Sequence, residues 1–130
     1  MDQHLPNRER INDRAKLIMH RLVARELARD PALMNRARDY LRARAFQLPG
    51  RDTTLEWEKL LSLPASVLRR KLTCRSEDMV RLRLSSPFMV VSSLGLDDIP
   101  LRRRIWRMAR RMRDPGPPSS VYSGPLAGPG

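Results

Sequence analysis

The chain contains few of the residues on which catalytic and metal sites depend. Cys74 is the one cysteine among 130 residues, which excludes an internal disulfide and a multi-cysteine metal site. The two histidines, His4 and His20, do not form a metal-binding pair, and no glycine-rich phosphate loop or nucleophile motif is present. Most acidic residues fall at the starts of predicted helices, where capping and the helix dipole account for them. We therefore expect a protein that is not an enzyme and that uses no cofactor or metal ion.

Long apolar segments are also missing. No stretch approaches the roughly 20 apolar residues that a membrane-spanning helix needs. The first residues, which include Asp2, His4 and Pro6, lack the apolar run of a signal peptide. A single cysteine fits a reducing compartment. These features predict a cytoplasmic protein without membrane association.

Aromatic residues make up only 5% of the chain, so each one is informative. Trp57 and Trp106 are either core anchors between helices, which the sequence favours, or surface anchors for a partner. The segment from Ser85 to Phe88 favours an ordered turn with Phe88 tucked inward, but a partner could instead recognise it as an exposed turn. The candidate partner-binding residues are Trp57, Ser85, Ser86, Pro87, Phe88 and Trp106.

What the chain has in excess is arginine. Lysine and arginine together number 26, only three of them lysine, against 14 acidic residues, and the net charge is +12. Seven of the thirteen residues 101–113 are arginine and none is acidic. Leu101, Ile105, Met108 and Met112 recur there at helical spacing, which predicts an amphipathic helix over residues 99–113. Its charged side is either a solvated face or a site for nucleic acid or an acidic protein. The candidate residues for such binding are Arg102, Arg103, Arg104, Arg107, Arg110 and Arg111.

Helical periodicity and capping signals cover most of the chain. Asp30-Pro31, the Thr53–Glu56 capping box, Pro64, Ser76 and Asp97 or Asp98 mark helix starts. The predicted helices cover about residues 8–28, 31–46, 54–63, 64–72, 77–84 and 99–113. Met89-Val90-Val91 suggests a short extended piece. We expect an all-α compact bundle of five or six short helices, with a single domain over residues 8–113. Residues 114–130 are rich in proline and glycine, which predicts a disordered tail.

Two predicted helices within residues 64–84 are joined by a tight turn. That arrangement is typical of a helix-turn-helix, a common DNA-binding motif. The joining residues Leu72 to Ser76 lack the glycine often found in its turn. DNA binding through these helices therefore stays an open alternative.

Several motifs resemble those of a group of small bacterial helical proteins that are often encoded like antitoxins. The segments are Trp57-Glu58-x-Leu60-Leu61-x-Leu63-Pro64, Ser76-Glu77, Leu82-Arg83-x-Ser85-Ser86-Pro87-Phe88, Ile105-Trp106-Arg107 and, upstream, Asp30-Pro31-Ala32-Leu33. The resemblance covers roughly residues 10–110. The stretch from Met89 to Asp98 departs from the group by being longer and more apolar.

The resemblance implies a non-enzymatic antitoxin-like protein that binds and neutralises a cognate toxin. Trp57, Phe88 and the helix Arg102–Arg113 would make the contacts. One alternative is a nucleic-acid-binding regulator that uses the same arginine-rich helix. Another is an accessory subunit of a larger enzyme. The toxin partner and a nucleic acid are compatible with each other in one protein.

Overall fold

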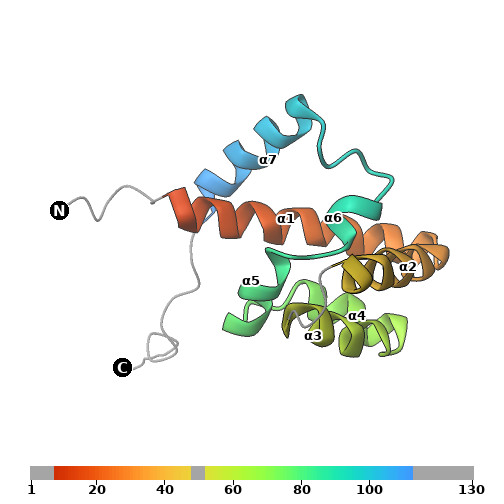
Figure 1. Cartoon of the computed structure of the whole chain (residues 1–130). Helices are drawn as coiled ribbons and strands as arrows, with labels where there is room; N and C mark the ends of the chain where they lie inside the picture. The colour runs from red at the N-terminus through yellow and green to blue at the C-terminus, as the bar shows by residue number, and fades with distance from the viewer. Residues whose placement is uncertain (1–7, 48–51, 113–130) are drawn as a thin grey trace, which may run out of the picture.

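The computed structural model describes residues 8–47 and 52–112, and all regular elements in this part of the chain are helices (Figure 1). They are α1 (Arg8–Arg29), α2 (Ala32–Gln47), α3 (Asp52–Leu61), α4 (Ala65–Leu72), α5 (Glu77–Arg83), α6 (Phe88–Val91) and α7 (Ile99–Arg111). The prediction of a compact all-α bundle is confirmed, with seven helices in the described residues where five or six were expected. The predicted disordered tail, residues 114–130, lies outside the described residues.

Helix α1 is the centre of the molecule. It contacts α2, α4, α5, α6 and α7, and α7 lies across it on the side opposite α3, α4 and α5 (Figure 1). Because neighbours pack on several sides of α1, four consecutive residues, Leu17 to His20, are all buried. An amphipathic surface helix would bury only one stripe. The amphipathic helix in this fold is instead α7.

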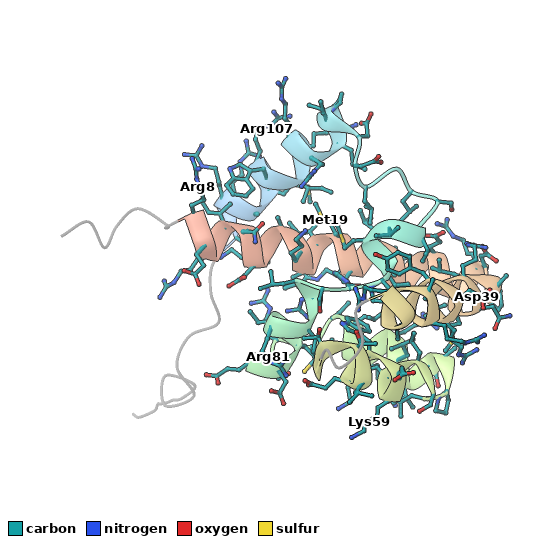
Figure 2. The ribbon with its side chains drawn as sticks, viewed as in Figure 1. Arg8, Met19, Asp39, Lys59, Arg81 and Arg107 are labelled. Carbon is teal, nitrogen blue, oxygen red and sulfur yellow. The ribbon has the colours of Figure 1, made fainter. Side chains whose placement is uncertain are left out.

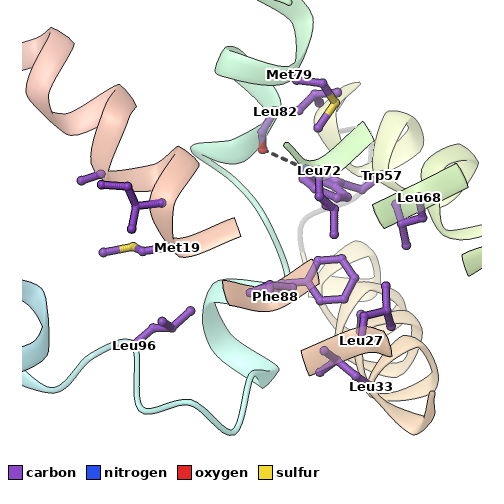
Figure 3. Close-up of a cluster of buried hydrophobic side chains, with 14 of the residues drawn as sticks. Met19, Leu27, Leu33, Trp57, Leu68, Leu72, Met79, Leu82, Phe88 and Leu96 are labelled. Atoms are coloured by element: carbon purple, nitrogen blue, oxygen red, sulfur yellow. Dashed lines mark hydrogen bonds between the residues drawn. The ribbon is translucent and has the colours of Figure 1, made fainter. Parts of the chain in front are cut away.

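Two fully buried aromatic rings pack against each other in the core between α1 and helices α3 and α5. Trp57 and Phe88 have no exposed surface, and their rings meet edge to face at 6.1 Å between centroids (Figure 3). The indole N–H of Trp57 donates a hydrogen bond to the carbonyl oxygen of Leu82 at 3.0 Å. The ring is therefore buried without leaving its polar atom unpaired.

The segment that places Phe88 in this core corrects one prediction. Met89-Val90-Val91 is not extended but belongs to the short helix α6. Pro87 holds a helical backbone at φ −65°, and the Ser86 hydroxyl accepts a hydrogen bond from the Phe88 amide. The extended prediction was wrong because this turn starts a helix, which turns Phe88 inward.

Predicted side-chain caps form at the starts of three other helices, at Asp30, Ser76 and Asp98. The predicted capping box is wrong as a helix start, because α3 already begins at Asp52 and so contains Thr53 and Thr54. The Asp30 carboxylate accepts a hydrogen bond from the Ala32 amide, and the Ser76 hydroxyl accepts one from Met79. Asp98 caps α7 by accepting a hydrogen bond from the Leu101 amide. Each cap satisfies an amide that the first turn of a helix leaves unpaired.

Two buried charged residues connect distant parts of the fold. Arg83, 1% exposed, donates from Nη1 to the carbonyl oxygens of Leu72 and Cys74 at the end of α4. Glu26 of α1 accepts hydrogen bonds from the hydroxyl of Ser92 and from the hydroxyl and amide of Ser93. Glu26 thereby fixes the segment between α6 and α7, and so helps to set where α7 begins.

Candidate partner-binding surface

Helix α7 packs chiefly on α1 and presents its other side outward. Ile105 and Ala109 are buried against the body of the protein, while Leu101 and Met112 are half-buried on the same side. The labelled side chain of Arg107 extends away from α1 in Figure 2. The predicted amphipathic helix is confirmed over Ile99–Arg111. The placement of Met108 on its buried stripe was wrong: Met108 is 52% exposed, and Ala109, four residues after Ile105, is buried instead.

The outward side of α7 carries the six arginines that the sequence marks for partner binding. We call them the arginine face: Arg102, Arg103, Arg104, Arg107, Arg110 and Arg111. All six are exposed, and within residues 8–47 and 52–112 none of them forms an ion pair. The ion pairs that the described residues do form lie elsewhere, such as Asp30 with Arg36 and Glu56 with Arg81. Within the described residues, no ion pair therefore compensates the positive charge of the arginine face.

The field of this face reaches α1. Lys16 on α1 is half-buried, and its pKa is lowered by burial and, secondarily, by the positive charge of Arg102. The first turn of α1 adds exposed Arg8 and Arg10 near the C-terminal end of α7, where Arg14 donates a hydrogen bond to the Ala109 carbonyl oxygen (Figure 2). The basic surface is thus formed by two packed helices.

An apolar depression interrupts the arginine face. Ile99 and Trp106, together with Arg102, Arg103 and Arg107, line a shallow hollow of about 370 Å³. Ile99 is 62% exposed and Trp106 is half-buried. We call this the Ile99–Trp106 hollow. Ile99 was not predicted, although its position away from the Leu101–Ile105 stripe could have revealed that it points outward.

The structure corrects the placement of most other candidate partner-binding residues. Trp57, Ser86, Pro87 and Phe88 are buried, so none of them offers a surface to a partner in this fold. Ser85 is half-buried, and its carbonyl oxygen accepts a hydrogen bond from Arg44. The core interpretation of Trp57 and the inward interpretation of Phe88 are the ones that the burial confirms. Trp106 alone among the aromatic candidates reaches the surface.

The helix pair α4 and α5 is poorly suited to DNA. The exposed first turn of α5 carries Glu77 and Asp78, where a recognition helix would approach the phosphates. Arg81 on the same helix is already paired with Glu56 at 2.6 Å. The sign of the charge therefore disfavours docking of α5 in a groove of duplex DNA.

Among residues 8–47 and 52–112, no group of three or more histidine, cysteine, aspartate or glutamate side chains is placed to hold a metal ion. In the same part of the chain, no helix has the length and apolar character required to cross a membrane.

Comparisons with known proteins found no matching protein-family model, no similar curated protein and no similar solved structure.

Proposed function

We propose that this chain is an antitoxin-like protein that binds and neutralises a cognate toxin, with the arginine face of α7 as its main contact surface. The proposal combines the antitoxin-like sequence motifs with the geometry of α7. The partner would be a protein with an acidic surface, since the described part of the chain supplies no carboxylate to these arginines. No catalytic step is involved.

The observation that carries the proposal is the arginine face itself: it is exposed, it has no ion pair among residues 8–47 and 52–112, and the other side of its helix is packed on the protein. Such charge steers association with an acidic surface and raises the association rate, an effect that salt weakens. The apolar hollow within the face adds to this support. A hydrophobic centre with a charged rim is the common anatomy of protein–protein interfaces.

The alternative is a nucleic-acid-binding regulator that uses the same face. Six exposed guanidinium groups on one helix would also suit phosphate oxygens. An apolar depression between them has no counterpart in the backbone of a duplex, which favours the protein partner. Both functions are compatible with one antitoxin, so the test must measure both.

The test replaces Arg103, Arg107, Arg110 and Arg111 with glutamine, which keeps helix propensity while removing four charges. The probes are the purified protein from the adjacent reading frame and a mixed-sequence DNA duplex. If the partner is an acidic protein, the variant should associate with it more slowly and lose most of the rate advantage at low salt. Stopped-flow fluorescence over a range of salt concentrations measures this.

A matched control removes the same charge from α1 and α4, by glutamine at the exposed residues Arg25, Arg29, Arg69 and Arg70. The control should associate nearly as fast as the unchanged protein.

If the DNA duplex is the partner instead, the α7 variant should lose affinity for duplexes of every sequence. The slope of log K against log salt should then shrink by up to about 0.9 per lost phosphate contact. Tight, salt-insensitive binding by the α7 variant to either probe would contradict the proposal.

A further inference from the structure

The Ile99–Trp106 hollow is unusual for a helix that already buries an apolar stripe. Ile105 and Ala109 use that stripe to pack against the protein, yet Ile99 is 62% exposed and Trp106 is half-buried on another side of α7. Scattered apolar residues are common on surfaces, but these two line one depression together. The second apolar side of α7 is therefore a feature that the packing of this chain does not explain.

Three residues of the hollow follow helical spacing, and a fourth residue beyond it continues the pattern. Ile99, Arg103 and Trp106 line the hollow at i, i+4 and i+7, and Arg110 follows at i+11, so the four form a stripe along the axis of α7. At 1.5 Å per residue the stripe is about 17 Å long, or three turns. A second helix laid along α7 presents side chains at the same spacing, as helices do when they dock into a groove.

The positive charge beside the stripe favours a docked helix that carries negative charge. Arg102, Arg103 and Arg107 line the hollow with the two apolar side chains, and none of them has an ion pair within the described residues. A partner helix with glutamate or aspartate on its flanks would compensate these charges. A basic or neutral helix would leave them without carboxylates, at a cost in desolvation.

The apolar side chains of Ile99 and Trp106 favour an apolar residue at the centre of that helix. Tryptophan and arginine are the residues most enriched where a few contacts dominate binding energy, in pockets from which the partner's side chain excludes water. A large aliphatic side chain would cover both the ring of Trp106 and the side chain of Ile99. An acidic helix without such a residue would leave the side chains of Ile99 and Trp106 exposed to water.

We infer that the Ile99–Trp106 hollow is the docking groove for an amphipathic acidic helix of the partner protein, which anchors one aliphatic side chain between Ile99 and Trp106. The inference rests on the proposed function and names the kind of segment that the arginine face binds. It assigns different roles to two sets of residues. The arginines provide salt-dependent attraction, and Ile99 with Trp106 provides recognition of the anchor.

The experiment uses two fluorescein-labelled synthetic helical peptides of about 14 residues, enough to span the stripe. Both carry glutamates on the flanks, and they differ only in a central leucine, which is alanine in the second. On the unchanged full chain, the leucine peptide should bind about tenfold tighter, an effect of the size expected for one anchored side chain. Fluorescence anisotropy measures both affinities.

The Trp106→Ala and Ile99→Ser variants test whether the hollow provides that advantage. In each variant the leucine peptide should lose most of its advantage over the alanine peptide. Met108→Ala is the matched control, because Met108 is also exposed on α7 but does not line the hollow. It should keep the full advantage. Ile99→Ser keeps the test valid if Trp106→Ala does not fold, since Ile99 is largely outside the core.

The outcomes separate this inference from the proposed function. Salt-dependent binding of both peptides that the four-arginine variant weakens, with no advantage for leucine, overturns the docking groove and leaves the acidic partner standing. No salt-dependent binding of either peptide counts against both. An equal leucine advantage in all variants also overturns the groove. So does tighter binding of a single-stranded oligonucleotide that depends on Trp106, because the ring would then stack on bases.

Discussion

The region around Trp57 and the region around Trp106 place the same amino acid in opposite surroundings. Trp57 is fully buried, with its ring against Phe88 and its indole N–H on a backbone carbonyl (Figure 3). Trp106 is half-buried on a helix with six exposed arginines and shares a hollow with exposed Ile99. The first ring has all its partners within the chain. The second is only partly covered by the chain, and that difference indicates which region is available for binding.

The strongest test of this comparison is the substitution of each tryptophan by alanine. Trp57→Ala should lower the free energy of unfolding by roughly 3–5 kcal/mol, since it removes a buried ring and leaves a cavity under Phe88. Trp106→Ala should cost clearly less, because part of its ring already faces water. Urea denaturation followed by circular dichroism measures both. Equal losses in the two variants would show that the two regions do not differ in the way the burial indicates.

The second prediction concerns pH and the buried side of α1. His20 has no exposed surface, and its Nδ1 donates to the Lys16 carbonyl oxygen at 2.7 Å, while Nε2 has no hydrogen-bond partner within the described residues. Burial is the main cause that lowers the pKa of His20 to about 4. The hydrogen bond to the Lys16 backbone acts in the opposite direction, and the positive charges of Arg83 and Lys16 lower the pKa further. The folded protein therefore keeps His20 neutral.

Because the unfolded chain binds a proton on His20 at higher pH than the folded chain, stability should fall as pH falls from about 6.5 towards 4. The full loss is about 3 kcal/mol at most, from the conversion of pKa differences to free energy. Urea midpoints between pH 5 and 7.5 measure the slope before carboxylates titrate strongly. His20→Asn, whose side-chain amide can replace the Nδ1 donor, should flatten that slope. An unchanged slope would assign the pH dependence to other groups.

The third prediction concerns the attachment that precedes α7. Burial acts against ionisation of Glu26, but the hydrogen bonds from Ser92 and Ser93 and the charge of Arg36 together lower its pKa. Glu26→Gln replaces one of the two accepting carboxylate oxygens with an NH₂ group, which donates. At least one of the three hydrogen bonds from Ser92 and Ser93 is then lost. The expected cost is roughly 1–3 kcal/mol, together with faster amide exchange at Ser93.

Arg36→Gln is the control for Glu26→Gln. Arg36 pairs with Asp30 at 2.9 Å and lies 3.8 Å from Glu26, but both Arg36 and Asp30 are well exposed. Its loss should cost at most about 1 kcal/mol, as is usual for exposed ion pairs. If both substitutions cost the same, the serine hydrogen bonds would not be what holds the segment before α7.

Sequence alone could predict the parts of this fold that depend on neighbouring residues. Caps at Asp30, Ser76 and Asp98 act within three residues of themselves, and the arginine face follows from helical spacing. The sequence favoured the core for Trp57 but could not show which residues bury it, because those contacts come from Leu82 and Phe88 in other helices. The Glu26–Ser92 hydrogen bond joins residues 66 positions apart in the sequence, and no local sequence pattern predicts it.

The smallest expected effect completes the comparison. Replacing Arg103, Arg107, Arg110 and Arg111 with glutamine should change the free energy of unfolding by no more than about 0.5 kcal/mol, as for surface substitutions away from packed contacts. A slight gain is the more reasonable direction, because the four removed charges repel one another at i, i+3 and i+4 spacing. Thermal or urea denaturation at low salt would reveal it best, since salt screens the repulsion. A loss of 2 kcal/mol or more would mean that these arginines stabilise the fold through contacts of their own. In that case the face of α7 would resemble the region around Trp57 after all, and its charge would no longer be free for a partner.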